Sequence, residues 1–185
     1  IDYAENSTPE NPIMIATAEE LKSTVESGGK GKYYKLANDI AVNDTSDDNW
    51  YEQDGLTQWL SNSQWDGQGF QGTIDGDGHT VTGLYNRIET SGVKYFGFLP
   101  QLTGTTVIRN LKIDRAYFSV KGNNEMAVGT FVGNEDAKDL TLENCAVGEN
   151  VIIRCESTNG NQMIGGFVGA LGGSGTLTVT DCLTD

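Results

Sequence analysis

Two short sequence landmarks recur, in the same order, through the second half of this 185-residue chain. The first is an alternating apolar segment that ends in Asn or Asp followed by Leu or Cys, and the second is Phe-Val-Gly. The first landmark recurs at intervals of 34 and 37 residues, and the second after 36 residues. Such a period indicates a repeat protein, and a repeat constrains architecture more than any other sequence feature. The residues that mark the repeat are Asn110, Asn144, Asp181, Phe131, Gly133, Phe167 and Gly169.

The residue types within the repeats exclude the common helical repeats. Ankyrin and tetratricopeptide units have similar periods, but each unit needs two helices rich in Ala and Leu. Here the repeats are rich in Gly, Thr, Val and Asn, which helices disfavour and strands or turns accept. We therefore expect an all-β protein, a right-handed parallel β-helix whose coils bury their apolar columns against one another.

Aligning the repeats predicts which residues stack in successive coils. One inward column is expected at Leu84, Leu111, Cys145 and Cys182, and another at Phe98, Phe131 and Phe167. This alignment places turns or stacked amides at Gly83, Asn110, Asn144 and Asp181, and gives coils of 27, 34 and 37 residues. Coils of that length are long for a solenoid, so the excess should bulge outward at 121–125 and 156–162.

The first half of the chain has clear local signals. Residues 1–12 are polar and suggest a flexible lead-in to one β-helix domain over 13–185. Thr17 with Glu20 forms a capping-box pattern, and Gly28-Gly29 ends the apolar spacing, which predicts a helix over about 18–27 that covers the first coil. Strands are expected at 34–40, 70–74 and 80–84, with Asp-Gly pairs at 75–78 supplying positive φ.

Charge limits the partners. Twelve basic against 26 acidic residues give a net charge of −14, which disfavours nucleic acid and anionic membrane surfaces. No segment is long and apolar enough to insert in a membrane, and the first residues do not form a signal peptide, which we expect to have been removed. Three cysteines do not make a disulfide scaffold. Cys145 and Cys182 are interpreted as stacked core thiols, with a disulfide as the alternative, and Cys155 as a core residue.

One stretch resembles a known pattern. Residues 70–84, Phe-Gln-Gly-Thr-Ile-Asp-Gly-Asp-Gly-His-Thr-Val-Thr-Gly-Leu, are similar to the Phe-x-Gly-x-x-Asp-Gly-x-Gly-His-x-Ile-x-Gly-Leu stretch of bacterial extracellular β-helix proteins with GLUG-type repeats. The helix-then-strand beginning and the Phe-Val-Gly and Asn-Cys landmarks extend the resemblance over about 13–182. It implies a pectin-lyase-like β-helix, secreted or attached to the bacterial cell surface and often part of adhesin-like or peptidase-containing proteins. It supplies no catalytic residues, and this chain departs from it at Pro100 and in its long tryptophan-containing loop.

Several residues have both a structural and a functional interpretation. His79 is the single histidine, and with Gly76 and Gly78 we interpret it as part of a turn, its ring bonded to backbone, since one histidine cannot build a multi-histidine zinc site. Asp75 and Asp77 fail the EF-hand spacing and suit turn chemistry. The acidic loop is the better calcium candidate, with solvated carboxylates as the alternative. Its acidic residues are Asp44, Asp47, Asp48 and Asp54.

The same loop, 43–69, holds all three tryptophans and is the sharpest candidate for ligand binding. Exposed rings of Trp50, Tyr51, Trp59 and Trp65 could stack on sugars, and buried rings would instead pack the loop against the domain. Exposed rings would indicate a binder of glycan or of a cell-surface or host protein, whereas buried rings would indicate a spacer.

Two functional classes follow. The first is a non-catalytic extracellular module, a stalk or adhesin segment, and the second is a polysaccharide lyase or glycosidase on the same scaffold. We prefer the first, because no paired carboxylates, basic cluster, Ser-His-Asp elbow or phosphate loop can be nominated. No cofactor other than calcium is expected. Because 177–182 begins a further coil, we also expect a fragment of a longer protein, or self-association through that open edge.

Overall fold

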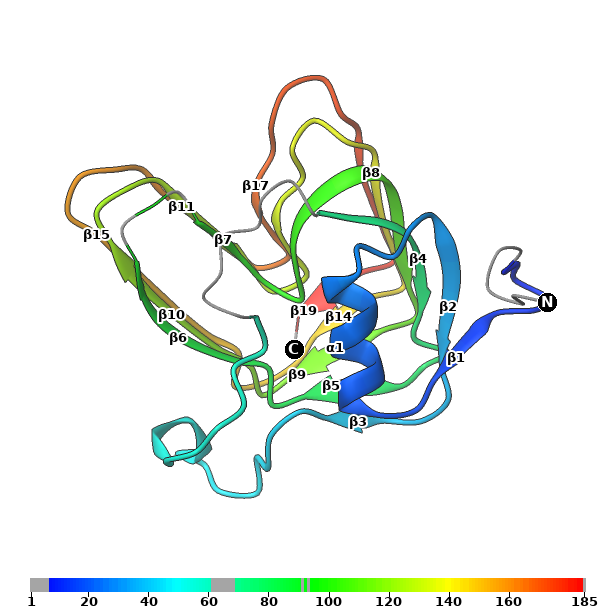
Figure 1. Ribbon diagram of the computed structural model, residues 1–185, viewed down its shortest axis with the longest axis horizontal. Helices are drawn as coiled ribbons and strands as arrows, with labels where there is room; N and C mark the ends of the chain where they lie inside the picture. The colour runs from blue at the N-terminus through cyan, green and yellow to red at the C-terminus, as the bar shows by residue number, and fades with distance from the viewer. Residues whose placement is uncertain (1–6, 61–68, 91, 93, 185) are drawn as a thin grey trace.

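The protein is a mostly β parallel solenoid of about three turns with one short N-terminal helix (Figure 1). The computed structural model describes residues 7–60, 69–90, 92 and 94–184. In Figure 1 the chain passes from β4 to β5, β6 and β8 as each coil winds away from α1, and the pairs between named strands are parallel. The expected β-helix is therefore confirmed.

Four parallel sheets form the walls. The largest contains β1 (Ile13–Ile15), β2 (Lys32–Leu36), β4 (Phe70–Asp75), β8 (Leu99–Arg109), β12 (Val132–Asn134), β13 (Leu140–Glu143), β17 (Val168–Ala170) and β18 (Leu177–Thr180). The second contains β3 (Ile40–Ala41), β5 (Thr80–Thr82), β9 (Lys112–Asp114), β14 (Ala146–Val147) and β19 (Leu183–Thr184). The third contains β6 (Tyr85–Thr90), β10 (Tyr117–Gly122) and β15 (Ile152–Ser157), and the fourth β7 (Lys94–Phe96), β11 (Met126–Gly129) and β16 (Gln162–Gly165).

The third and fourth sheets extend together from the main body as an arm, at the left of Figure 1. The loops between β10 and β11 and between β15 and β16 lie at the tip of this arm, where the sequence predicted that the excess length would bulge. The arm thus holds part of the length of these coils.

Helix α1 (Ala18–Glu26) forms where the capping box predicted it. The hydroxyl of Thr17 accepts from the N–H of Glu20 at 3.2 Å, and Glu20 accepts in return from the N–H of Thr17. Leu21 and Val25 are buried among core residues of the first coils, so the helix covers one end of the solenoid. No helix in the described part of the chain has the length and apolarity needed to cross a bilayer.

The core consists of inward columns fixed by strand register. One column runs through Tyr34, Ile74, Ile108, Leu142 and Val179, which pair in successive strands. A parallel arrangement in the second sheet aligns Ile40, Val81 and Ile113. Because successive coils pair in register, apolar residues fill each column, and the column is buried through Leu142, whereas Val179 in the last coil is 46% exposed.

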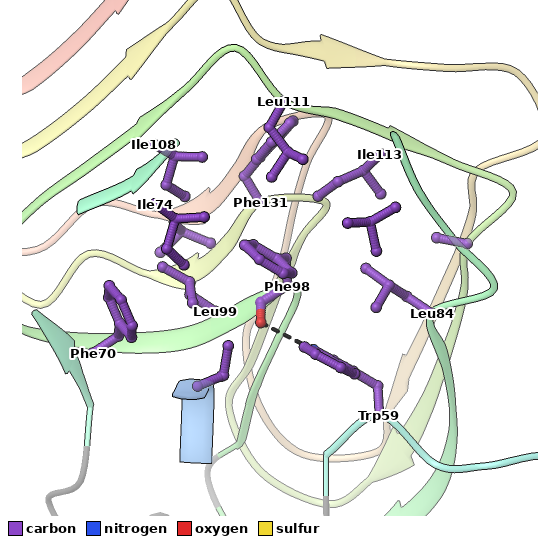
Figure 2. Packing of buried hydrophobic residues seen from close by; sticks show 14 of the residues in the cluster. Trp59, Phe70, Ile74, Leu84, Phe98, Leu99, Ile108, Leu111, Ile113 and Phe131 are labelled. Carbon is purple, nitrogen blue, oxygen red and sulfur yellow. Dashed lines mark hydrogen bonds between the residues drawn. The ribbon is translucent and has the colours of Figure 1, made fainter. Parts of the chain in front are cut away.

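The predicted phenylalanine column is confirmed and gains a fourth ring. Phe131 stacks on Phe167 with centroids 5.7 Å apart, and register places Phe98 next in line. Trp59 then stacks on Phe98 at 5.9 Å and donates from Nε1 to the Phe98 carbonyl oxygen at 2.9 Å (Figure 2). The loop before β4 thus closes this aromatic column at the helix-covered end.

The predicted Leu84 column is wrong in its first member. Strand register places Leu111, Cys145 and Cys182 in one column, but Leu84 precedes Tyr85, whose partner is Tyr117, so Leu84 aligns with Ala116. Gly83 correspondingly aligns with Arg115 at another corner, and the position equivalent to Asn110 is Gly76. With this correction the first coil runs from Gly76 to Asn110. Its length is therefore 34 residues, the same as the interval from Asn110 to Asn144, and the expected length of 27 is wrong.

Two glycines are required by close backbone approach. A Cβ at Gly76 would lie 2.4 Å from the Asn110 carbonyl oxygen of the next coil, and Gly76 does not have the positive φ that was expected. Asp77 and Gly78 have it instead, at 52° and 84°. A Cβ at Gly133 would lie 2.6 Å from the carbonyl oxygen of Pro100, which occupies the equivalent position one coil earlier, as the sequence suggested.

Truncating Trp59 should be severe. Its ring is 0% exposed, so Trp59→Ala removes a stacked ring and leaves the Phe98 carbonyl without its donor. We expect the free energy of unfolding to fall by about 3–5 kcal/mol in denaturant titrations. Trp59→Phe should lose less, and the exposed control Lys30→Ala should stay within about 0.5 kcal/mol of the parent. A Trp59→Ala loss as small as that of the control would contradict the packing role.

Candidate functional site on the outer face of the arm

The aromatic residues of the long loop do not share one environment. Trp59 is inside the solenoid, and Trp50 is 2% exposed on the outside of the third sheet. Tyr51 is half-buried beside Trp50, and Trp65 lies outside the described residues. Because neither Trp50 nor Trp59 has a free ring face for a sugar, the structure assigns packing roles to both, and Tyr51 is the remaining described ring of the predicted binding set.

Trp50 and Tyr51 belong to a second hydrophobic cluster, which we call the outer aromatic cluster: Trp50, Tyr51, Tyr85 and Tyr117. Tyr85 and Tyr117 face outward on paired positions of β6 and β10, with centroids 5.7 Å apart. A short 3-10 turn, η2 (Trp50–Glu52), brings Trp50 edge-on to Tyr85 at 6.1 Å. These ring contacts attach the loop to the outside of the arm.

Tyr51 completes the cluster on its solvent side. Its ring stacks on Tyr117 at 4.6 Å with an interplanar angle of 3°. The guanidinium carbon of Arg154, on β15, lies 5.7 Å from the Tyr117 centroid, and its Nη1 contacts the Tyr117 hydroxyl at 3.5 Å. Tyr85 and Tyr117 are themselves buried, so the half-buried Tyr51 ring and the Arg154 guanidinium are the parts of this cluster that can meet a planar or anionic group.

Sequence reasoning missed Tyr85, Tyr117 and Arg154 as site residues. They occupy the outward positions of Tyr85-Asn86-Arg87, Tyr117-Phe118-Ser119 and Ile152-Ile153-Arg154, three segments that pair directly. The alternation of inward and outward residues was available as a signal. The alignment of Leu84 with Leu111 placed these three segments out of register, so their outward residues could not be compared.

The acidic loop does not gather a metal site in the part of the chain that the structure describes. Asp44 accepts from the N–H of Ser46 at 2.9 Å and Asp47 from the N–H of Asn49 at 2.8 Å, so both form local turns. The bond from Ser46 also lowers the pKa of Asp44. Asp48 and Asp54 are exposed. These residues therefore shape the loop that carries Trp50, by the turn chemistry typical of aspartate.

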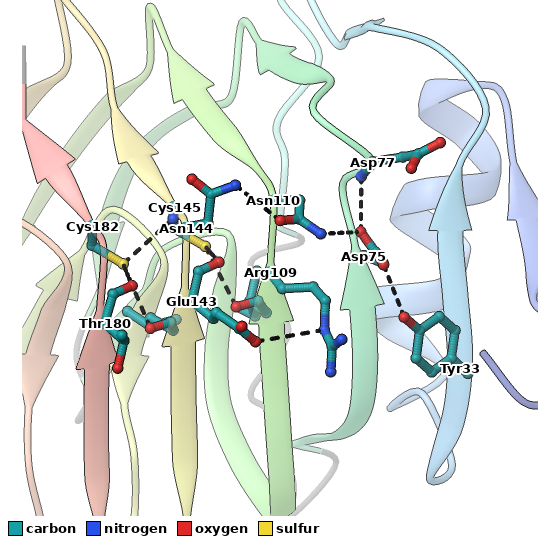
Figure 3. A network of polar contacts seen from close by, with 12 residues as sticks. Tyr33, Asp75, Asp77, Arg109, Asn110, Glu143, Asn144, Cys145, Thr180 and Cys182 are labelled. Atoms are coloured by element: carbon teal, nitrogen blue, oxygen red, sulfur yellow. Dashed lines mark hydrogen bonds and ion pairs between the residues drawn. The ribbon is translucent and has the colours of Figure 1, made fainter.

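Asp75 is the centre of a polar network on the largest sheet (Figure 3). Its carboxylate accepts from the Tyr33 hydroxyl at 2.8 Å, from Asn110 Nδ2 at 3.0 Å and from the N–H of Asp77 at 2.9 Å. Asn144 donates in turn to Asn110 at 2.9 Å, which gives the stacked amides that the sequence predicted. Asn110, Asn144 and Asp181 all have φ between 51° and 53°, so this column marks the corner of each coil.

The hydrogen bonds of this network control ionisation. Burial works to raise the pKa of Asp75, but the bonds from Asn110, Asp77 and Tyr33, with the nearby charge of Arg109, outweigh it and hold the pKa below 3.8. For Tyr33, burial and the bond to Asp75 raise the pKa above 10.0. Both shifts stabilise an ionised Asp75 bonded to a neutral Tyr33, which is an arrangement for holding coils together.

His79 has a different partner from the one expected. Its Nδ1 lies 3.2 Å from Oδ1 of Asp39, which also accepts from the N–H of Thr80 at 2.9 Å. The ring therefore bonds a side chain of the previous coil rather than backbone. The contact joins the turn before β5 to the turn before β3, which is consistent with a structural role for His79.

The cysteines are free thiols. Cys182 Sγ accepts from the N–H of Cys145 at 3.4 Å, so the two stack in one column as predicted. Burial raises the pKa of Cys145 to about 12, which makes its thiolate inaccessible at neutral pH. Cys155 is half-buried against the core, with its pKa also raised by burial.

Replacing Asp75 should change the acid sensitivity of the fold. The native pKa is lowered, so the carboxylate stabilises the protein above its unfolded pKa, and this contribution is lost as pH falls through the native pKa. We expect Asp75→Asn to cost about 1–3 kcal/mol at neutral pH. The difference from the parent should shrink below about pH 4, whereas the exposed control Asp54→Asn should show neither effect. Urea titrations across pH measure both, and a pH-independent deficit would contradict the assignment.

Calcium should leave the loop unaffected. Asp44 and Asp47 are engaged with backbone N–H groups, and the four carboxylates do not converge. We expect the same melting temperature in millimolar calcium and in chelator. A calcium-dependent rise that Asp48→Asn abolishes would instead show a metal site in this loop.

Comparisons with known proteins find distant relatives. No known family profile matches the chain. Halomucin of Haloquadratum walsbyi is 30% identical over 177 residues, which are 95% of this chain and 2% of that protein. A protein of Evansella cellulosilytica, provisionally named a Gly-rich membrane protein, is 29% identical over 128 residues, covering 69% of this chain and 14% of that protein.

Among solved structures, a crystal structure at 1.30 Å from Bacteroides ovatus, provisionally named an immunoglobulin A1 protease, covers 98% of this chain and 78% of that one. Its TM-score is 0.33 and its identity 15%. The chain, a β-solenoid by its own strand pairing, is distantly related by sequence to halomucin and to the Evansella protein, and it spans a small part of the length of each.

Proposed function

We propose that this chain is a non-catalytic module of an extracellular or cell-surface protein, a stalk or adhesin segment of the kind that GLUG-type repeats build. The carrying observation is the continuity of its columns. From Tyr34 to Val179 every coil packs on the previous one in register, and the aromatic and amide columns run in the same direction. Such a solenoid is a stiff rod in which each coil supports the next.

The environment of the aromatic rings supports a spacer more than a tryptophan-based binder. Trp50 and Trp59, which are buried, pack the long loop onto the outside and the inside of the solenoid. The displaced pKa values point the same way, since those of Cys145 and Asp75 arise from core burial and from bonds between coils. Displaced values in an enzyme would instead be expected around a cleft.

The relatives support the location. Halomucin is so long that the 177 aligned residues are 2% of it, and the Evansella protein is named for a membrane. A module of about 20 kDa that repeats one stacking rule suits a small part of a long surface protein. Its acidic charge of −14 keeps such a surface solvated.

Two measurements test the proposal. Polysaccharide gels, neutral and acidic, should show no clearing after incubation with the protein, with an active polysaccharide lyase as the positive control. Antibodies against the folded domain should label intact cells of the source organism, with a cytosolic protein as the negative control. Cleared polymer would replace the proposal by a lyase or glycosidase, and labelling only after lysis would refute a surface location.

A further inference from the structure

The arginines of this acidic chain differ in whether they have partners. Arg109 faces Glu143 at 4.0 Å, and Arg115 donates to the Thr45 carbonyl oxygen at 2.8 Å. Arg87 and Arg154 are exposed, and neither has a carboxylate within ion-pair distance in the described part of the chain. Both guanidinium groups lie on one sheet, where they are accessible to an anionic partner.

Strand register places these two arginines in one row. Arg87 on β6 pairs with Ser119 on β10, and Ser119 pairs with Arg154 on β15. Because neighbouring strands are about 4.8 Å apart, the two arginines begin about 10 Å from each other on one face. The hydroxyl of Ser119 lies between them. The row therefore presents two guanidinium groups, with the Ser119 hydroxyl between them as a neutral donor and acceptor.

The aromatic cluster forms one border of this row. Tyr85, Tyr117 and Ile152 occupy the neighbouring outward positions, and Arg154 is held over Tyr117 at 5.7 Å. Tyr51, stacked on Tyr117 at 4.6 Å, adds a half-buried ring above the sheet. The other border is the row of Glu89, Lys121 and Glu156. The two arginines thus lie between the aromatic cluster on one side and the carboxylates of Glu89 and Glu156 on the other.

We propose that this face of β6, β10 and β15 binds an acidic polysaccharide, with Arg87 and Arg154 pairing with uronate carboxylates of one chain. Guanidinium groups bind carboxylates through two parallel hydrogen bonds, and a sugar C–H face can pack on the half-buried Tyr51 ring. Ser119 is placed to bond a hydroxyl of the sugar between the two carboxylates. This site uses tyrosine and arginine, rather than the tryptophans that the sequence suggested.

The surrounding charges select against other polyanions. Nucleic acid binding needs many phosphate contacts, and two arginines on a chain of net charge −14 cannot supply them. The Glu89 and Glu156 side chains repel densely sulfated polymers, which carry more charge for each sugar than a polyuronate. A polymer with one carboxylate for each sugar therefore matches the row best.

Affinity electrophoresis through gels containing polygalacturonate tests the site, with mobility corrected in blank gels. The parent should be retarded, and Arg87→Gln with Arg154→Gln should lower the association constant about tenfold or more. The matched control, Lys30→Gln with Lys138→Gln, removes the same charge elsewhere and should retain binding. Circular dichroism and melting curves of each variant verify that the fold is unchanged.

Two further variants separate recognition from simple charge. Arg154→Lys keeps the charge but loses the paired hydrogen bonds, so it should bind more weakly than the parent. Tyr51→Ala should also weaken binding while leaving the arginines in place. Equal retardation of the arginine and lysine double variants would overturn the site. Absence of retardation of the parent, equal retardation by methyl-esterified or sulfated polymer, or preference for polyglutamate would also overturn it.

Discussion

The structure depends on the in-register parallel stacking of one coil on the next. In a parallel ladder each residue has a fixed neighbour in the coil before and after it, so a column persists only if successive residues can occupy the same place. Phe131 lies on Phe167, Asn144 bonds Asn110, and Cys145 bonds Cys182 because register leaves them no other neighbours. The core and the corner ladder are therefore two results of the same constraint.

The corner residues show what that constraint requires. Asn110, Asn144 and Asp181 have positive φ, which Asn and Asp tolerate better than other non-glycine residues. Their neighbour in the preceding coil, Gly76, has no side chain because the Asn110 carbonyl oxygen lies against it. The amide ladder passes instead to Asp75, whose carboxylate ends the column by accepting three hydrogen bonds. The first copy of the repeat thus differs in its backbone as well as in its residues, since Gly76 lacks the positive φ of the later corners.

The architecture could be predicted from the sequence, because the spacing of repeated residues indicates which residues pair in successive coils. The intervals between Asn110, Asn144 and Asp181, together with the capping box at Thr17, predicted the solenoid and its helix. The prediction failed at Leu84, because Gly83-Leu84 looks like the turn-plus-apolar pair Asn110-Leu111 although it forms a different corner. Two corners with the same local chemistry can be separated only by pairing, which is a non-local property.

The candidate site was harder to predict, because loop placement is decided by tertiary packing. Nothing local distinguishes Trp59, which enters the solenoid and closes the phenylalanine column, from Trp50, which packs on the outside against Tyr85. Both destinations are apolar surfaces that already exist on the coils. Asp44 and Asp47, which precede Trp50, form local turns in the segment that leads to the outer surface.

The division between inner and outer positions also explains where a binding function can reside. Along β6, β10 and β15 the inward side chains, such as Phe118 and Val120, are 0% and 1% exposed and are fixed by their column. The outward positions of Arg87, Ser119 and Arg154 bear no such core constraint, so these residues can differ from coil to coil. A solenoid therefore keeps its fold in alternate residues and its specificity in the others. Arg87 and Arg154 occupy such outward positions, so the packing of the core does not determine their identity and a surface interaction can.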